Sequence, residues 1–295
     1  MKIVSLLPSA TEIVYALGVE GSLRGVSFEC DHPPPARALP RVSGTSLPSG
    51  REMTPSRIDA EVSSRVAAGE SIYTLDDRLI RRIQPDLILT QDLCRVCAVP
   101  SGEVQDALDL LGCRAEVVSL DPHRLDEVIG CIETVGGVTG TAERAEEVSS
   151  ALRGRVECVR AATGGRPRPR VLALEWSDPP FSAGHWVPDM VEAAGGTSLL
   201  ADPGDRSRRL SWSEVAEVDA DIVVFMPCGF DLQGAVDQAA PLLKRAELSG
   251  AGAFWAVDAN GYFSRPGPRV VDGVEMLAQM FRDPGRSPAA ARRLR

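Results

Sequence analysis

Residues 141–162, TAERAEEVSSALRGRVECVRAA, decide the organisation of this chain, because they form a long amphipathic run rich in Glu and Arg. The run lies within a stretch from Leu125 to about Ala162 that contains no strand candidate. The first part of this stretch, 126–135, also has a helical pattern, which the glycines at 136, 137 and 140 interrupt. A long helix between two halves of the chain is the simplest explanation of this pattern.

On both sides of this helical region, short β-rich runs alternate with helical patterns, which is typical of doubly wound α/β sheets. Several runs are almost entirely apolar, as parallel strands covered on both faces are. The strand candidates are 2–7, 23–28, 86–90, 115–120, 170–176, 221–226 and 254–258. The sequence predicts an α/β fold of two doubly wound lobes joined by a long backbone helix, with an N-terminal lobe over 1–122, a helical linker over 123–165 and a C-terminal lobe over 166–295.

The composition favours a packed protein with a small ligand over a nucleic-acid or membrane partner. Hydrophobic residues make up 44% of the 295 residues, and the formal net charge is -9. An acidic chain without a long Lys/Arg stripe is a poor partner for a phosphate backbone. No apolar stretch reaches the roughly 18 residues that a membrane span needs, so membrane insertion is not expected.

The N-terminus begins directly with an apolar strand candidate, 2–7, followed by Ser9 and Glu12 at the spacing of a helix capping box. The two parts of a signal peptide, a positively charged region and an apolar core, are not found before this strand. The sequence therefore predicts a cytoplasmic protein. In that compartment the seven cysteines are expected to be thiols, available to metals or to redox chemistry.

Four cysteines follow predicted strands directly, at the end of a parallel sheet where ligands bind. They are Cys30, Cys94, Cys97 and Cys228. A thiolate-rich site for an iron–sulfur cluster or zinc is one interpretation, and chance placement of ordinary thiols is the other. The remaining three, Cys113, Cys131 and Cys158, are expected to be small buried hydrophobes.

The spacing of Cys94 and Cys97 also allows a redox disulfide, which makes a thiol–disulfide redox protein a further alternative. Such a protein does not need Cys30 or Cys228. Walker, GxGxxG and GxSxG motifs are absent from the sequence. Nothing specifies a nucleophile with its base, so the sequence leaves open whether the protein is an enzyme.

Aromatic residues are scarce, at 5% of the chain, yet several gather after one strand candidate of the C-terminal lobe. They could form the apolar wall of a site for a large flat ligand, or they could simply pack in the core. His32 and His185 lie in loops near strand ends, where each is either a metal ligand or a hydrogen-bonded loop residue. The aromatic residues are Trp176, Phe181, Trp186 and Trp212.

Four segments together resemble one known group of proteins. They are 3–12 (IVSLLPSATE), 85–91 (PDLILTQ), 184–188 (GHWVP) with 194–196 (AGG), and 263–268 (FSRPGP). The chain resembles, over essentially its whole length, the vitamin B12-binding branch of the ABC-transporter substrate-binding proteins, the class that also carries haem and ferric siderophores. The resemblance implies two α/β lobes joined by one long helix, with the ligand in a cleft between the lobes. It also implies that the loops around Ser9, Glu29, Trp176 and Trp186 face cobalamin or a related tetrapyrrole.

Two features depart from the transport members of that family: the chain shows neither a signal peptide nor a lipid anchor, and it carries the four strand-end cysteines. These features predict a cytoplasmic relative that binds a metallocofactor, with delivery to a permease doubtful. The predicted cofactor-binding residues are Ser9, Glu29, Trp176, Phe181, His185, Trp186 and Trp212, and the predicted metal ligands are Cys30, Cys94, Cys97 and Cys228. The alternatives are an iron–sulfur or zinc protein, possibly an enzyme, and a thiol–disulfide redox protein.

Overall fold

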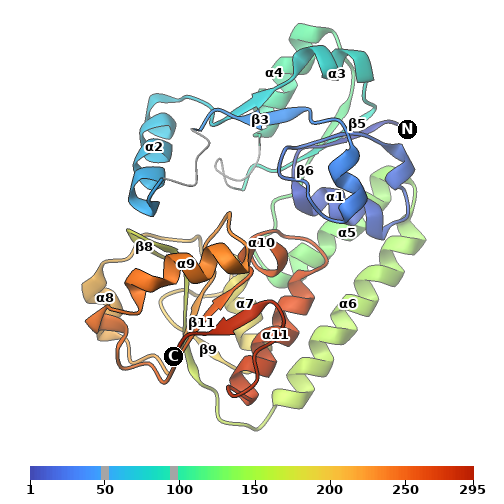
Figure 1. Cartoon of the computed structure of the whole chain (residues 1–295). Coiled ribbons are helices and arrows are strands. Elements are labelled where there is room, and N and C mark those ends of the chain that lie inside the picture. Colours follow the sequence, from blue (N-terminus) through green and yellow to red (C-terminus); the bar gives the residue numbers. More distant parts are fainter. Residues whose placement is uncertain (48–52, 94–98) are drawn as a thin grey trace. The chain divides into compact units, whose positions relative to one another are not determined.

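A computed structural model describes residues 1–47, 53–93 and 99–295 of the chain. It divides into two compact units, each containing a sheet of mainly parallel strands (Figure 1). Unit 1 comprises Met1–Asp121 and Gly130–Ser149, and unit 2 comprises Pro122–Ile129 and Ser150–Arg295. The predicted α/β fold class is confirmed. The predicted limits of the lobes and the ligand cleft between them stay predictions.

The sheet of unit 1 consists of four parallel strands in the order β2 (Leu23–Val26), β1 (Ile3–Ser5), β5 (Leu87–Thr90) and β6 (Glu116–Ser119). The central strands β1 and β5 are buried at every position, which explains their nearly continuous apolar runs. A separate antiparallel pair is formed by β3 (Ser43–Thr45) and β4 (Tyr73–Leu75). The helices of this unit are α1 (Pro8–Ala16), α2 (Pro55–Ala68), α3 (Asp77–Ile83) and α4 (Ser101–Leu111), with short 3-10 turns at Glu20–Ser22 and Pro34–Ala38.

Helix α1 begins two residues earlier than a Ser9–Glu12 capping box requires. Its N-cap is Leu7, whose side chain makes no capping hydrogen bond, and Pro8 occupies the first helical position. Proline is favoured there because it has no N–H to satisfy and its φ already suits a helix. Ser9 therefore lies inside the helix, where it is buried, and the predicted capping box is wrong.

The sheet of unit 2 has the strand order β12 (Ala291–Arg293), β11 (Ala253–Val257), β10 (Ile222–Phe225), β7 (Arg170–Ser177) and β8 (Pro180–Ser182). Strands β11, β10 and β7 are parallel, whereas β12 and β8 run antiparallel to their neighbours. The short strand β9 (Thr197–Ser198) also pairs with β7. The helices are α7 (Val187–Ala193), α8 (Trp212–Glu217), α9 (Leu232–Leu242), α10 (Ala259–Tyr262) and α11 (Val270–Arg282), with a 3-10 turn at Ala246–Leu248.

The region between the two α/β halves is two helices, α5 (Leu125–Thr139) and α6 (Ala142–Thr163), and not one. Gly136 and Gly137 lie within α5 and do not interrupt it. A Cβ at Gly136 would lie 2.3 Å from the Cβ of Ala145, so the glycine allows α5 and α6 to pack closely. The turn comes at Gly140, whose φ of +74° is a left-handed conformation that glycine adopts without strain.

Arg155 ties α6 to the rest of unit 2. Its guanidinium lies 2.5 Å from the carboxylate of Asp272 and 2.7 Å from that of Glu275, both on α11. The two carboxylates raise the pKa of Arg155. Over the residues that the structure describes, no helix is both long and apolar enough to cross a membrane.

Candidate ligand-binding site

Hydrogen bonds join three segments of unit 2 near the ends of β7, β10 and β11. The backbone N–H of Cys228, after β10, donates to the carbonyl oxygen of Glu175 on β7 at 3.1 Å. The N–H of Gly229 donates to the side-chain oxygen of Asn260 after β11, also at 3.1 Å, and the N–H of Asn260 donates to the carbonyl of Phe230 at 3.2 Å. Since parallel strands end at one edge of a sheet, these bonds join the loops into one surface, which we call the carboxyl edge.

Two aromatic rings contact each other on the carboxyl edge. The centroids of Trp176 and Phe230 lie 6.1 Å apart, with the ring planes at 45°, and both residues are half-buried. Phe181, on the neighbouring strand β8, is also half-buried and lies under the guanidinium of Arg209, 5.7 Å from its ring centroid. The carboxyl edge therefore exposes parts of three aromatic side chains, and the positively charged guanidinium of Arg209 lies over one of them, Phe181.

The other two predicted aromatic residues have partners within the protein. Trp186 is only 6% exposed, and its indole N–H donates to the carbonyl oxygen of Phe263 at 2.8 Å. Trp212, at the start of α8, lies under the guanidinium of Arg245, 3.9 Å from the ring, and packs against the hydrophobic core. These contacts favour a packing role for both side chains. Their predicted contact with ligand stays a prediction.

His185, three residues after β8, is held in an uncommon conformation. Its φ is +54°, and its ring centroid lies 5.8 Å from that of His123 and 5.8 Å from that of Trp186. Burial lowers the pKa of His185, and the nearby His123 and Arg206 lower it further. The imidazole is therefore neutral near pH 7, the form in which a ring nitrogen can bind a metal.

In unit 1, the predicted site residues Ser9, Glu29 and Cys30 follow β1 and β2. Ser9 is buried and Glu29 is half-buried. Cys30 is fully enclosed, and the hydroxyl of Thr11 donates to its sulfur at 3.1 Å. Burial raises the pKa of the Cys30 thiol, although hydrogen bonds with Thr11 and Ser27 act in the opposite direction. The protonated thiol is a poor metal ligand, since metals bind thiolate.

The structure does not test the predicted four-cysteine site as a whole. Cys94 and Cys97 lie outside the described residues, while Cys228 is exposed at the carboxyl edge. Within 1–47, 53–93 and 99–295, no group of three or more His, Cys, Asp or Glu residues could hold a metal ion. An iron–sulfur cluster or zinc therefore has no support from the described part of the chain, and the site stays a prediction.

The expectation for the other three cysteines is correct for two of them. Cys113 and Cys131 are buried, as predicted. Cys158 is exposed on α6, so its predicted burial is wrong. Residue 158 lies between the apolar face and the charged face of a long helix. The burial of such a residue cannot be predicted from the sequence pattern, because the packing partner decides which face is covered.

Three residues that form the carboxyl edge were not predicted: Phe230, Arg209 and Asn260. Phe230 lies two residues beyond Cys228, in the loop that follows β10, and this position just after a strand is the sequence signal that marks it. Arg209 could not be found in this way, because it precedes a helix and reaches Phe181 only through the pairing of two segments that are distant in sequence.

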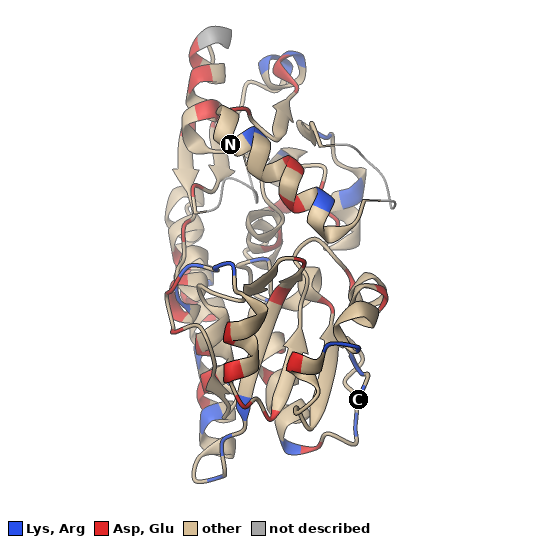
Figure 2. Ribbon diagram, turned by 90° about the vertical axis from the view of Figure 1, so that its left-hand side faces the viewer, with Lys and Arg blue, Asp and Glu red and all other residues tan. Residues whose placement is uncertain are grey.

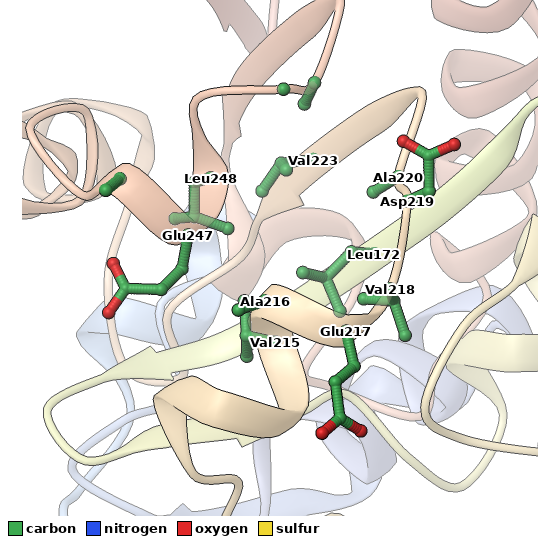
Figure 3. A pocket seen from close by; sticks show the side chains of 13 residues that line it. Leu172, Val215, Ala216, Glu217, Val218, Asp219, Ala220, Val223, Glu247 and Leu248 are labelled. Carbon is green, nitrogen blue, oxygen red and sulfur yellow. The ribbon is translucent and has the colours of Figure 1, made fainter.

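A pocket of about 410 Å³ lies elsewhere in unit 2 (Figure 3). Its lining residues begin or precede β7, β10 and β11, among them Leu172, Ala220 and Ala251. It therefore lies at the amino ends of these strands, away from the carboxyl edge. Figure 3 shows its margin carrying the carboxylates of Glu217, Asp219 and Glu247, directed away from the apolar lining.

Comparison with known proteins gives similarities over nearly the whole chain. The family model described as periplasmic binding protein matches residues 3–245. A vitamin B12-binding protein of Vibrio cholerae is 25% identical over 282 residues, which cover 94% of this chain and 87% of that protein. A substrate-binding lipoprotein of an ABC transporter from Bacillus subtilis is 23% identical over 94% of this chain and 79% of its own length. A periplasmic haem-binding protein from Roseiflexus has the same fold, with a TM-score of 0.69 at 22% identity, covering 97% of this chain and 99% of that one.

These similarities correct one prediction and establish the family. The predicted cytoplasmic location is wrong, because the matching proteins are periplasmic binding proteins or lipoproteins, which point to a location outside the cytoplasm. The predicted resemblance to the B12-binding branch of the substrate-binding proteins is confirmed. Since the family model matches most of the chain, the protein belongs to the periplasmic binding protein family.

Proposed function

We propose that this protein binds a tetrapyrrole-type ligand, a corrinoid of the cobalamin kind or a haem, on the carboxyl edge of unit 2. The observation that carries the proposal is the pair of half-buried rings, Trp176 and Phe230, at the ends of β7 and β10. The names of the relatives, which bind vitamin B12 or haem, support this class of ligand. We also infer that a permease of the ABC type receives the ligand, as the name of the Bacillus subtilis relative suggests.

The chemistry of the edge suits a large, flat and partly apolar molecule. Aromatic rings offer a wide apolar surface and favour stacking with another π system. Burying one such ring against a ligand contributes on the order of 1–3 kcal/mol. His185 of the same unit adds a neutral imidazole, which is the form that can bind the metal of a macrocycle.

The test is a titration with hydroxocobalamin and with haemin while the fluorescence of tryptophan is followed. We expect quenching at micromolar ligand, because Trp176 would lie against an absorbing macrocycle. Trp176→Ala should raise the dissociation constant about 5- to 100-fold, which corresponds to the loss of one buried ring.

Trp212→Ala is the matched control. Because Trp212 already packs under Arg245 and against the core, its loss should lower the stability of the protein and leave ligand affinity within about twofold. If neither ligand changes the fluorescence of the wild-type protein at micromolar concentration, and neither changes its own absorption spectrum, the proposed function is wrong.

A further inference from the structure

The pocket of about 410 Å³ at the amino ends of β7, β10 and β11 has a largely apolar lining (Figure 3). Leu172, Val223 and Leu248 are buried and belong to the hydrophobic core, whereas Ala216 and Val218 line the more exposed part of the pocket. Clefts that hold small molecules usually enclose roughly 300–1,000 Å³. The pocket therefore has room for the apolar part of a small molecule.

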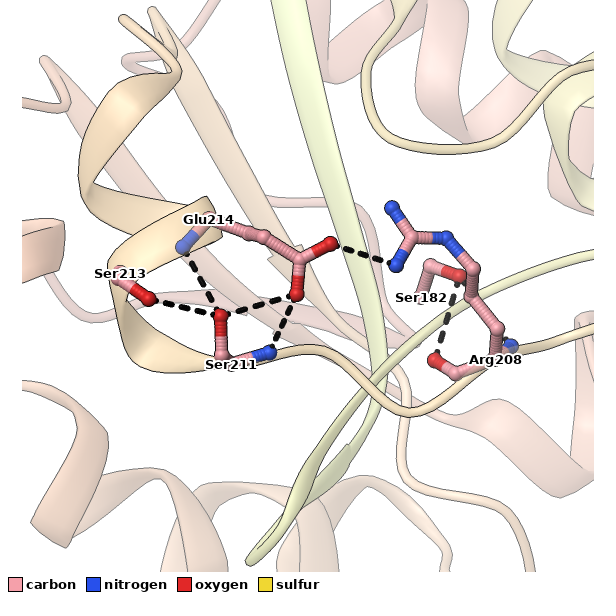
Figure 4. A network of polar contacts seen from close by, with 5 residues as sticks. All are labelled: Ser182, Arg208, Ser211, Ser213 and Glu214. Atoms are coloured by element: carbon pink, nitrogen blue, oxygen red, sulfur yellow. Dashed lines mark hydrogen bonds and ion pairs between the residues drawn. The ribbon is translucent and has the colours of Figure 1, made fainter.

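Helix α8 forms one wall of the pocket, and its first turn is capped within the protein. The side-chain oxygen of Ser211 accepts a hydrogen bond from the N–H of Glu214 at 3.2 Å, and the carboxylate of Glu214 accepts one from the N–H of Ser211 at 2.7 Å (Figure 4). Arg208 lies 2.8 Å from the same carboxylate. The charged groups at this end of α8 are therefore engaged with one another.

The last turn of α8 lines the pocket, and this end of the helix is not capped. The chain leaves the helix at Val218 in an extended conformation, with φ -93° and ψ 132°. In the described part of the chain, the N–H of Val218 makes no capping hydrogen bond, whereas at the end of α9 the N–H of Leu243 donates to the carbonyl of Ala239 at 3.1 Å. The last carbonyls of a helix need donors and carry a partial negative charge. The pocket therefore offers acceptors to a positively charged N–H donor.

Two of the three carboxylates at the margin of the pocket are already paired. The carboxylate of Asp219 lies 3.3 Å from the guanidinium of Arg170. The carboxylate of Glu247 lies 3.4 Å from the guanidinium of Arg245. A further guanidinium, that of Arg295, donates to a backbone carbonyl of the lining. These arginines are held by the protein, and they compensate two of the three negative charges.

Glu217, the last residue of α8, carries the third carboxylate. Within 1–47, 53–93 and 99–295, this carboxylate forms no hydrogen bond or ion pair, and the residue is exposed. Acidic residues, red in Figure 2, occur throughout both units, so negative charge alone does not distinguish this place. The pocket is distinguished by three features together, which are the apolar lining, the uncapped end of α8 and the uncompensated charge of Glu217.

We propose that this pocket binds an organic amine, a molecule in which a protonated amino group is attached to an apolar chain or ring. The apolar part would enter the lining formed by residues such as Leu172 and Val223. The ammonium group would stay at the mouth, where the carbonyl end of α8 and the carboxylate of Glu217 attract it. The site is separate from the carboxyl edge, because it lies at the opposite ends of the same strands, and it does not depend on the proposed function.

The experiment titrates the complete chain with butyl-, pentyl- and hexylammonium while the backbone amides of 215–220 and 250–251 are followed by NMR. The affinity should rise about fourfold for each methylene that enters the apolar lining. Hexan-1-ol, which has the same chain but no charge, should bind about three- to tenfold more weakly, because it lacks the attraction to the helix end and to Glu217. Hexanoate should not shift these amides.

Two variants test the two parts of the site, each with a matched control. Glu217→Gln should reduce the preference for hexylammonium over hexan-1-ol by about two- to threefold, whereas Glu143→Gln, at an exposed position on α6, should keep it. Ala216→Leu should fill part of the pocket and weaken both ligands about tenfold. Ala240→Leu, at an exposed position of α9 outside the lining, should leave both affinities within about twofold. Circular dichroism and thermal unfolding check that every variant folds.

The outcomes separate this inference from the proposed function. It is overturned if hexylammonium at about 10 mM shifts none of these amides, if hexan-1-ol binds as tightly as the amine, or if Ala216→Leu binds both as the wild type does. Haemin and hydroxocobalamin should bind Ala216→Leu and the wild type within about twofold of each other. If macrocycles bind and amines do not, only this inference fails; if amines bind and macrocycles do not, only the proposed function fails.

Discussion

The indole N–H of Trp186 donates a hydrogen bond of 2.8 Å to the carbonyl oxygen of Phe263, 77 residues further along the chain. Trp186 immediately precedes α7, and Phe263 follows α10. This bond joins two of the segments by which the chain resembles the substrate-binding proteins, GHWVP and FSRPGP. The bond lies beside His185 and is buried within unit 2. It therefore stabilises the folded conformation of the two segments, and any effect on ligand binding follows from that stabilisation.

Replacing Trp186 by Phe should leave the carbonyl of Phe263 buried without this partner. An unsatisfied buried polar group costs about 1–3 kcal/mol, and the smaller ring removes further packing. We expect the melting temperature to fall by roughly 2–4 °C for each kcal/mol lost, measured by calorimetry. Trp212→Phe, which keeps a ring under Arg245, is the control, and an equal loss in the two variants would contradict the role of this bond.

The cysteines should differ sharply in their reactivity toward a thiol reagent. Cys30 is enclosed and its pKa is raised by burial, so it should react only when the protein unfolds. Cys158 and Cys228 are exposed and should react in the native state. Mass spectrometry of protein alkylated at pH 8, with and without denaturant, identifies the modified residues. Rapid native labelling of Cys30 would show that its surroundings open readily.

Glu214 should stabilise the protein at neutral pH and lose this effect in acid. Hydrogen bonds from Ser211, together with Arg208, lower the pKa of Glu214 from 4.5 to about 2. The contribution is fully present above pH 4.5 and disappears as the pH falls toward 2, because protonation weakens these bonds. Unfolding by urea between pH 7 and pH 3 should therefore show a steeper decline for the wild type than for Glu214→Gln. Glu70→Gln, an exposed position after α2, should behave as the wild type does.

His185 should oppose folding once the pH falls below about 6.5. Its pKa in the folded protein is lowered by burial and by the neighbouring His123 and Arg206. Since the unfolded chain takes up a proton first, stability declines as the pH falls below 6.5, until the pH reaches the lower, folded pKa. NMR titration of the imidazole should place its midpoint below 6.5, and Arg206→Gln should move the midpoint upward. A midpoint at or above 6.5 would contradict the burial of this ring.

The amino-acid sequence by itself determined the class of fold and the edge at which to look for a site. Strands such as β1 and β5 are buried on both faces, so their apolar runs are visible in the sequence, and the polar residues after a strand mark its carboxyl end. The long helical region was visible as well, because α6 is a long run rich in Glu and Arg that contains no strand candidate.

Only the tertiary structure decided which of the predicted residues share a surface. In the sequence, Trp176 and Trp212 are both aromatic residues of the same segment. In the structure, the ring of Trp176 contacts Phe230, whereas the ring of Trp212 lies under the guanidinium of Arg245. Cys30 follows its strand as Cys228 does, but Cys30 is enclosed and Cys228 is exposed. The physical reason is the same in both cases: the period of a strand or helix fixes the order of side chains, whereas burial and ring contacts depend on segments far away in the chain, whose approach no local pattern records.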